Sequence, residues 1–199
     1  MATGNATAGW PDWRMGLLFM IGALVMRGAG CTVNDLADRR IDGKVARTAK
    51  RPIASGAVSV TRGVLFLVMQ LALGFAVLVQ FNAFTIKLGV ASLALVAIYP
   101  FMKRITYWPQ LWLGLTFNWG ALIGWSTVQG GLGLAPGLLY AAGILWTLGY
   151  DTIYAHQDKE DDLIAGVKSS ALALGTDTKP WLILFYTASI GLIGAAGAV

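Results

Sequence analysis

The sequence contains few cysteines, few histidines and little charge. Of its 199 residues, one is a cysteine (Cys31), one is a histidine and only 13% are charged. A single cysteine excludes a disulfide scaffold and a multi-cysteine zinc site. A soluble domain is about one quarter charged, so this composition also excludes a disordered, collagen-like or nucleic-acid-binding protein, despite the net charge of +5. A polytopic membrane protein or an unusually apolar soluble helical bundle remains.

Long apolar stretches decide between these two classes. Hydrophobic residues make up 56% of the chain, and a helix crosses the hydrocarbon core with about 20 mostly apolar residues. The stretches show neither the single apolar stripe of a soluble helix nor the strict alternation of a membrane strand. The sequence therefore predicts an all-α, polytopic membrane bundle of about six transmembrane helices. The six stretches are Trp13–Val33, Gly63–Phe81, Phe84–Phe101, Gln110–Val128, Pro136–Tyr154 and Trp181–Val199.

The charged residues follow every second stretch. The loops Asn34–Arg62, Met102–Pro109 and Ala155–Pro180 carry most of the 15 Lys and Arg residues, whereas the connectors Asn82–Ala83 and Gln129–Ala135 carry no charge. Successive spans alternate in direction, so the three basic loops share one face. The positive-inside rule places that face in the cytoplasm or the equivalent matrix. We expect an integral protein of a bacterial or mitochondrial inner membrane.

The same face carries a first group of acidic residues, directly after the first stretch. If the helix continues, Asn34, Asp38 and Asp42 stand at positions i, i+4 and i+8, and Asp35 adds to the same face. Like charges at this spacing destabilise a helix unless a cation lies among them. A cation at this helix end would relieve that repulsion.

A second acidic group ends the fifth stretch, where Asp151, Asp158 and Asp162 share a face at i, i+7 and i+11. Mg²⁺ is usually held by one or two carboxylates together with substrate phosphates. Two clusters on one face therefore predict a diphosphate bridged by Mg²⁺ between them. The alternative is a pair of solvated loops whose basic residues neutralise the acids. One cluster alone favours that alternative, whereas two in helical register favour the site.

Basic residues near these clusters complement the predicted diphosphate. Lys103 and Arg104 end the third stretch, where they act either as positive-inside anchors or as groups that neutralise a leaving group. Arg39, Arg51 and Lys168 are candidates for the same neutralising role.

An arginine also lies inside the first apolar stretch. Arg27 precedes Asn34 by seven residues, and an ionisable residue in a membrane span is a functional candidate by default. It either binds a substrate carboxylate or pairs with an internal acid such as Asp151. The rings of Tyr99, Trp146 and Tyr154 either stabilise a substrate cation or serve as ordinary interfacial aromatics.

The ordered set of motifs resembles the UbiA-type intramembrane prenyltransferase family. The motifs that carry the resemblance are Asn34-Asp35-x-x-Asp38-x-x-x-Asp42, Arg51–Gly56, Tyr99–Arg104, and Asp151-x-x-Tyr154-Ala155-x-x-Asp158-x-x-x-Asp162 followed by Gly166–Ser169. Within the family, the stretch Tyr150–Lys159 is similar to the branch that prenylates 4-hydroxybenzoate in ubiquinone biosynthesis.

The resemblance implies a reaction and a set of roles. A polyprenyl chain would pass from its diphosphate to the carbon ortho to the hydroxyl of 4-hydroxybenzoate, with Mg²⁺ as cofactor. Arg39, Lys103, Arg104 and Lys168 would neutralise the departing diphosphate beside Tyr154, while Arg27, Asn34, Asp35, Arg51, Tyr99 and Asp151 would contact substrates. Asn34, Asp38, Asp42, Asp158 and Asp162 would hold the Mg²⁺–diphosphate. The sequence does not identify a protein partner.

The resemblance also sets an expectation about length. Members of the family are typically bundles of about nine membrane helices, and the motifs align so that the helix before Trp10 and the last two helices fall outside this chain. We therefore expect residues 1–199 to form one domain that is incomplete at both ends.

Three other functions remain open at this point. A sister enzyme would use another acceptor, such as homogentisate, dihydroxynaphthoate or haem B. A phosphatidyl transferase also uses Mg²⁺ and a diphosphate, but Asp42–Arg47 is followed by no further Asp at the spacing that such enzymes need. A non-catalytic transporter or assembly subunit would place its acids near the membrane midplane, whereas these lie at span ends.

Overall fold

The computed structural model describes residues 12–43 and 48–199, and its regular elements there are helices. The elements in chain order are α1 (Trp13–Asp42), α2 (Val60–Leu78), α3 (Ala83–Ile105), α4 (Pro109–Phe117), α5 (Trp119–Gln129), α6 (Leu134–Gln157), α7 (Lys159–Ala165), α8 (Ser170–Leu174), the short 3₁₀ helix η1 (Gly175–Asp177) and α9 (Thr178–Ala196). The predicted all-α class is confirmed.

Most of the predicted membrane spans are long, apolar helices. In the described part of the chain, four helical segments are long and apolar enough to cross a membrane: α1, α2, α3 and the segment Ser170–Ala196 that contains α9. The fifth predicted stretch forms the 24-residue helix α6. The fourth is divided into α4 and α5 at Asn118, so this stretch is not one continuous helix.

The helix termini follow local sequence signals. The side chains of Ser59 and Asn82 accept hydrogen bonds from the backbone N–H groups of Arg62 and Thr85, and they thereby cap α2 and α3. Gly130 ends α5 in the left-handed region, with φ of 70°, where glycine is favoured.

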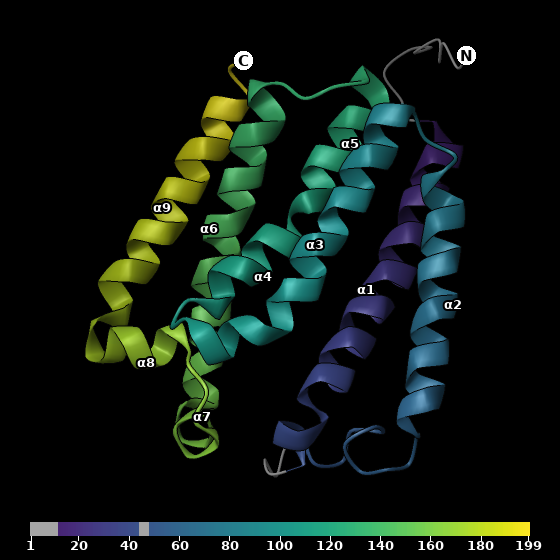
Figure 1. The fold of residues 1–199 in the computed structure, drawn as a ribbon. Helices are drawn as coiled ribbons and strands as arrows, with labels where there is room; N and C mark the ends of the chain where they lie inside the picture. Colours follow the sequence, from purple (N-terminus) through teal and green to yellow (C-terminus); the bar gives the residue numbers. More distant parts are fainter. Residues whose placement is uncertain (1–11, 44–47) are drawn as a thin grey trace.

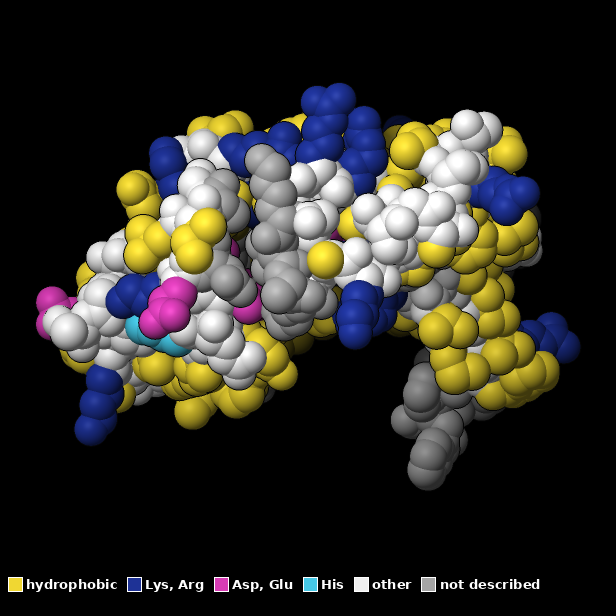
Figure 2. Space-filling view, turned by 90° about the horizontal axis from the view of Figure 1, so that it is seen from below, with side chains coloured by type: hydrophobic (Ala, Val, Ile, Leu, Met, Phe, Trp, Pro, Cys, Tyr) yellow, Lys and Arg dark blue, Asp and Glu magenta, His cyan; other side chains and the backbone are white. Residues whose placement is uncertain are grey.

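The long helices stand side by side in a curved row (Figure 1). Helix α1 packs against α2 on one side and α3 on the other, α4 joins α3 to α6, and α9 packs along α6. The C-terminal ends of α1, α3 and α6 therefore lie at one end of the bundle, together with α7 and α8 (Figure 1). Seen from that end, Lys and Arg side chains gather on the surface while apolar side chains cover the flanks (Figure 2).

Small and hydroxyl-bearing residues hold the helices together. Thr85 Oγ1 of α3 and Ser126 Oγ of α5 lie 2.9 Å apart, and Ser189 Oγ of α9 donates to the Ala142 carbonyl of α6 at 2.8 Å. Their side chains are fully buried, whereas many large apolar side chains are exposed. Burial of small polar residues and exposure of large apolar ones are typical of a membrane bundle, where small residues permit close helix approach and large apolar residues face lipid.

Candidate functional site

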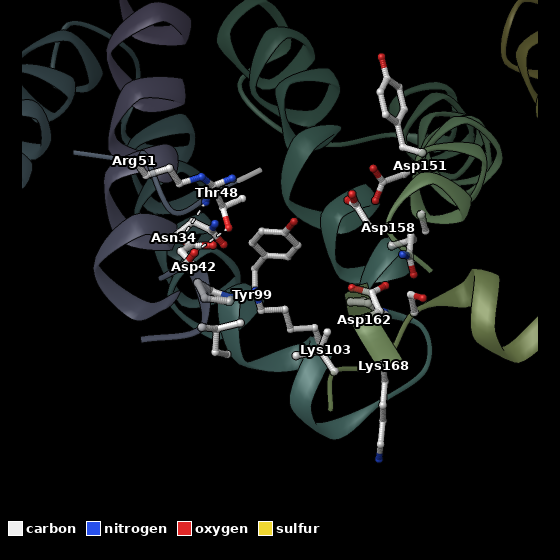
Figure 3. Close-up of a pocket in the computed structure, with 18 residues that line it drawn as sticks. Asn34, Asp42, Thr48, Arg51, Tyr99, Lys103, Asp151, Asp158, Asp162 and Lys168 are labelled. Carbon is white, nitrogen blue, oxygen red and sulfur yellow. Dashed lines mark hydrogen bonds and ion pairs between the residues drawn. The ribbon is translucent and has the colours of Figure 1, made fainter. Parts of the chain in front are cut away.

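A cavity of about 260 Å³ opens at the charged end of the bundle. Its walls come from the end of α1 with the segment that follows it, from α3 and the start of α4, and from α6 and α7 with the segment after them (Figure 3). Most of the predicted site residues line it: Asn34, Asp42, Arg51, Tyr99, Lys103, Asp151, Tyr154, Asp158, Asp162 and Lys168. Residues more than 100 positions apart in the sequence thus face one space.

The first wall forms because α1 continues to Asp42, as the acidic spacing predicts. Asp42 is buried, with 4% of its surface exposed. Arg51 Nη1 binds both Asp42 Oδ2, at 3.1 Å, and Asp35 Oδ1, at 3.0 Å. One guanidinium therefore joins two of the stacked carboxylates and relieves the repulsion expected between them.

The opposite wall carries the second acidic group. Helix α6 ends at Gln157, and Asp158 forms a turn before α7 begins, so the three acids do not share one uninterrupted helix. The Asp162 N–H still donates to the Asp158 carbonyl at 2.7 Å. This bond preserves the four-residue spacing across the turn, and Asp151, Asp158 and Asp162 all line the cavity (Figure 3).

Helix α3 contributes Tyr99 and Lys103 between these walls (Figure 3). Lys103 Nζ binds Asp38 Oδ2 at 2.5 Å, and Arg104 Nη2 binds Asp38 Oδ1 at 3.2 Å. The Asp38 side chain is fully buried. Asp38 thus joins α1 to the end of α3 and holds Lys103 where its side chain reaches the cavity.

Five predicted site residues lie outside the cavity lining: Arg27, Asp35, Asp38, Arg39 and Arg104. Arg27 is exposed in α1, with its guanidinium carbon 6.0 Å from the centre of the Phe117 ring. Arg39 is also exposed and donates to the Leu36 carbonyl at 2.8 Å.

Lys168 lines the cavity with part of its side chain, but its ammonium is held elsewhere. Nζ donates to the Ile105 carbonyl at 3.0 Å and lies 5.2 Å from the centre of the Tyr107 ring. The Lys168 N–H also donates to the Lys103 carbonyl at 2.7 Å. Lys168 therefore ties the segment after α7 to the end of α3.

Sequence reasoning missed three polar residues of the cavity wall: Thr48, Gln110 and Ser169. Thr48 Oγ1 donates to the Asp42 carbonyl at 3.1 Å. Gln110 begins an apolar stretch, and a polar residue there is a signal that was available. Ser169 lies in the Gly166–Ser169 motif, but spacing alone assigns it no partner.

The cavity offers the donor atoms that a hard divalent cation prefers. Asn34 and Asp42 on one wall and Asp158 and Asp162 on the other supply amide and carboxylate oxygens. Among the described residues, no three His, Cys, Asp or Glu side chains converge to hold a metal ion by themselves. This arrangement fits Mg²⁺ bound by few carboxylates and completed by phosphate oxygens.

The chain is similar to known proteins along nearly all of its length. The mitochondrial 4-hydroxybenzoate polyprenyltransferase of Drosophila melanogaster is 58% identical over 195 residues, which cover 97% of this chain and 50% of that protein. The protein of the same name in Homo sapiens is 55% identical over 189 residues, covering 94% of this chain and 51% of its own length. The chain thus spans about half the length of these relatives.

Solved structures share the fold. A UbiA homologue from Aeropyrum pernix K1 in its apo form matches with a TM-score of 0.78 and 30% identity, over 91% of this chain and 70% of its own. A UbiA homologue from Archaeoglobus fulgidus bound to GPP and Mg²⁺ matches with a TM-score of 0.72 and 20% identity, over 90% of this chain and 65% of its own.

A family model supports the same assignment. The model described as the UbiA prenyltransferase family matches residues 2–199, which is almost the whole chain. The motifs, the helical bundle and the acid-lined cavity agree with that match. The chain belongs to the UbiA prenyltransferase family.

Proposed function

We propose that this protein is a Mg²⁺-dependent 4-hydroxybenzoate polyprenyltransferase that acts in ubiquinone biosynthesis. The observation that carries the proposal is the cavity in which Asn34 and Asp42 face Asp158 and Asp162 across the end of α3. The relatives named for this activity, at 55–58% identity, support the choice of acceptor.

The proposed chemistry needs a site for a diphosphate. The acids of the two walls would hold Mg²⁺, which when bound stabilises the negative charge of the leaving diphosphate. Lys103 lines the cavity and Arg104 is its neighbour in α3, so the pair supplies positive charge beside the same group. We propose that Arg51 adds to it from the first wall.

The remaining steps are formation of the prenyl cation and its reaction with the acceptor ring. The carbon–oxygen bond breaks, the diphosphate leaves with the electron pair, and an allylic cation remains. The ring carbon ortho to the hydroxyl forms a bond to that cation, and the proton of the same carbon then passes to the released diphosphate, which restores the aromatic ring. Tyr99 and Tyr154 line the cavity, and their ring faces would stabilise the cation. The reaction also requires that water be kept from the cation, because water would otherwise consume it.

Arg27 is our candidate for the acceptor carboxylate. It precedes Asn34 by two turns of α1, on the same side of the helix, and is exposed. A guanidinium recognises a planar carboxylate through two parallel hydrogen bonds.

The proposed location is the inner membrane of mitochondria or of a bacterium, with the cavity on the matrix or cytoplasmic side. The Lys and Arg residues at the cavity end support this orientation through the positive-inside rule (Figure 2). The mitochondrial names of the relatives support the first compartment.

The test uses membranes that contain this chain, incubated with geranyl diphosphate, 4-hydroxybenzoate and Mg²⁺, with and without EDTA. The expected product is ring-prenylated 4-hydroxybenzoate that forms only with Mg²⁺ and is identified by mass spectrometry. The Drosophila melanogaster relative, assayed in parallel, provides the positive control. Prenylation of homogentisate or dihydroxynaphthoate in place of 4-hydroxybenzoate would overturn the acceptor, and folded protein without any product would overturn the activity of this chain.

A further inference from the structure

The hydroxyl of Ser169 is buried in the cavity wall and has no partner in the part of the chain that the structure describes. Ser169 is 3% exposed, and among the described residues its Oγ has no hydrogen-bond partner. Burying a hydroxyl unpaired costs free energy, so buried polar groups are nearly always hydrogen-bonded. Because Ser169 lines the cavity, a polar group bound there would satisfy this hydroxyl.

Gln110 presents a second donor to the same cavity. It is 5% exposed, and its Oε1 accepts from the Ser170 N–H at 3.1 Å. That bond fixes the orientation of the amide, because a backbone N–H requires the oxygen and not the nitrogen. No hydrogen bond from the Gln110 NH₂ to another described residue is present, so this donor is also available to a ligand.

The three basic residues that line the cavity are already engaged by the protein. Arg51 binds Asp35 and Asp42, Lys103 binds Asp38, and the Lys168 ammonium binds the Ile105 carbonyl. A diphosphate presents more oxygen atoms than a few shared cations can saturate. Neutral donors suit this position, since they bind phosphate oxygens without forming ion pairs with the carboxylates that line the same cavity.

We propose that Ser169 and Gln110 are substrate-binding residues that donate hydrogen bonds to the phosphate oxygens of the prenyl diphosphate. The proposal rests on the proposed function, because it requires a diphosphate in this cavity. It assigns Ser169 and Gln110 to the diphosphate rather than to the aromatic acceptor. Ser170, which is the next residue, differs because its Oγ lies 2.7 Å from Thr152 Oγ1 and is satisfied within the protein.

The test measures binding directly, with this chain in lipid nanodiscs and calorimetric titration of inorganic pyrophosphate, then geranyl diphosphate, in the presence of Mg²⁺. We expect Ser169→Ala to weaken both affinities by roughly tenfold, the effect of losing one hydrogen bond to a charged group. Ser169→Thr keeps the hydroxyl and should restore most of the affinity. The affinity for 4-hydroxybenzoate should not change.

Gln110→Glu gives an independent variant. It keeps an oxygen for the Ser170 N–H but replaces the NH₂ donor with a negative oxygen, so diphosphate affinity should fall by at least tenfold. Ser170→Ala is the matched control, which removes a buried hydroxyl next to the site and should lower thermal stability without changing the affinity.

The outcomes separate this inference from the proposed function. If the unmodified chain binds neither pyrophosphate nor geranyl diphosphate, the proposed function fails and this inference fails with it. If the unmodified chain binds them and both Ser169→Ala and Gln110→Glu bind equally well, the inference alone is overturned. A loss of 4-hydroxybenzoate binding without a loss of diphosphate binding would also overturn it, because the two residues would then serve the acceptor.

Discussion

The carboxylates at the cavity end differ in what they do, although the sequence spaces them alike. Asp42 lines the cavity and shares Arg51 with Asp35. Asp38 lies one helical turn before Asp42, yet its side chain is fully buried and binds two cations of α3. In this structure, residues of one motif therefore divide into those that line the cavity and those that bind side chains of another helix.

Replacing Asp158 tests the proposed role of the carboxylates that line the cavity. We expect Asp158→Asn to lower Mg²⁺-dependent prenyl transfer by at least about 100-fold, because the carboxylate charge would hold the cation that stabilises the leaving diphosphate. Product formation is measured over a Mg²⁺ titration, with circular dichroism to verify the helical fold. Glu160→Gln, which changes an exposed acid of α7, is the matched control. Normal turnover by Asp158→Asn would refute the proposed role of Asp158 in holding Mg²⁺.

Replacing Asp38 tests the ion pairs that join α1 to the end of α3. We expect Asp38→Asn to destabilise the protein by about 1–2 kcal/mol, because the buried side chain loses its charge-assisted bonds to two cations, while water compensates the partly exposed cations that remain. Thermal unfolding in detergent measures this change, and pyrophosphate affinity should fall too because Lys103 loses its anchor. Asp177→Asn, at an exposed acid, should change neither quantity. Unchanged stability of Asp38→Asn would contradict the assigned ion pairs.

Among the elements, the division between α4 and α5 is the main departure from the predicted spans. Asn118 stands at the break, and its Nδ2 donates to the Gly114 carbonyl and to Thr147 Oγ1, each at 2.9 Å. The side chain thus satisfies a carbonyl at the end of α4 and fastens the break to α6. Local hydropathy did not reveal the break, because both halves are apolar and the contact with α6 joins residues far apart in the sequence.

A substitution at Gly143 tests how tightly the break between α4 and α5 packs against α6. A Cβ atom at Gly143 would overlap the Asn118 side chain, which its two hydrogen bonds hold in place. We expect Gly143→Ala to destabilise the protein by about 1–3 kcal/mol, which is the usual cost of overpacking. Gly124→Ala is the control, because no atom lies within 4 Å of the Cβ it adds. Thermal unfolding measures the stability of both variants. Equal melting temperatures would show that the Asn118 side chain can move away from an added Cβ at position 143.

For the whole molecule, the proposed orientation follows from the distribution of charge. In a Cys31→Ala background, Lys50→Cys marks the cavity end and Leu132→Cys marks the opposite end, both at exposed positions. In intact bacterial cells, a membrane-impermeant maleimide should label the cysteine at 132 and not the one at 50, since the basic end stays in the cytoplasm. Labelling at 50 alone would invert the proposed topology.

The sequence by itself determined the membrane class, most of the spans, the charged end and most of the cavity residues. These features depend on hydropathy, charge and helical spacing, which are properties of short segments. Only the tertiary structure decided which charged and polar side chains contact one another, because these side chains come from different segments of the chain. Arg51 joins Asp35 to Asp42, Lys103 and Arg104 bind Asp38, and Ser169 remains buried without a partner among the described residues beside the cavity. These contacts depend on how α1, the segment that follows it, α3 and the segment after α7 converge, and no local pattern encodes that geometry.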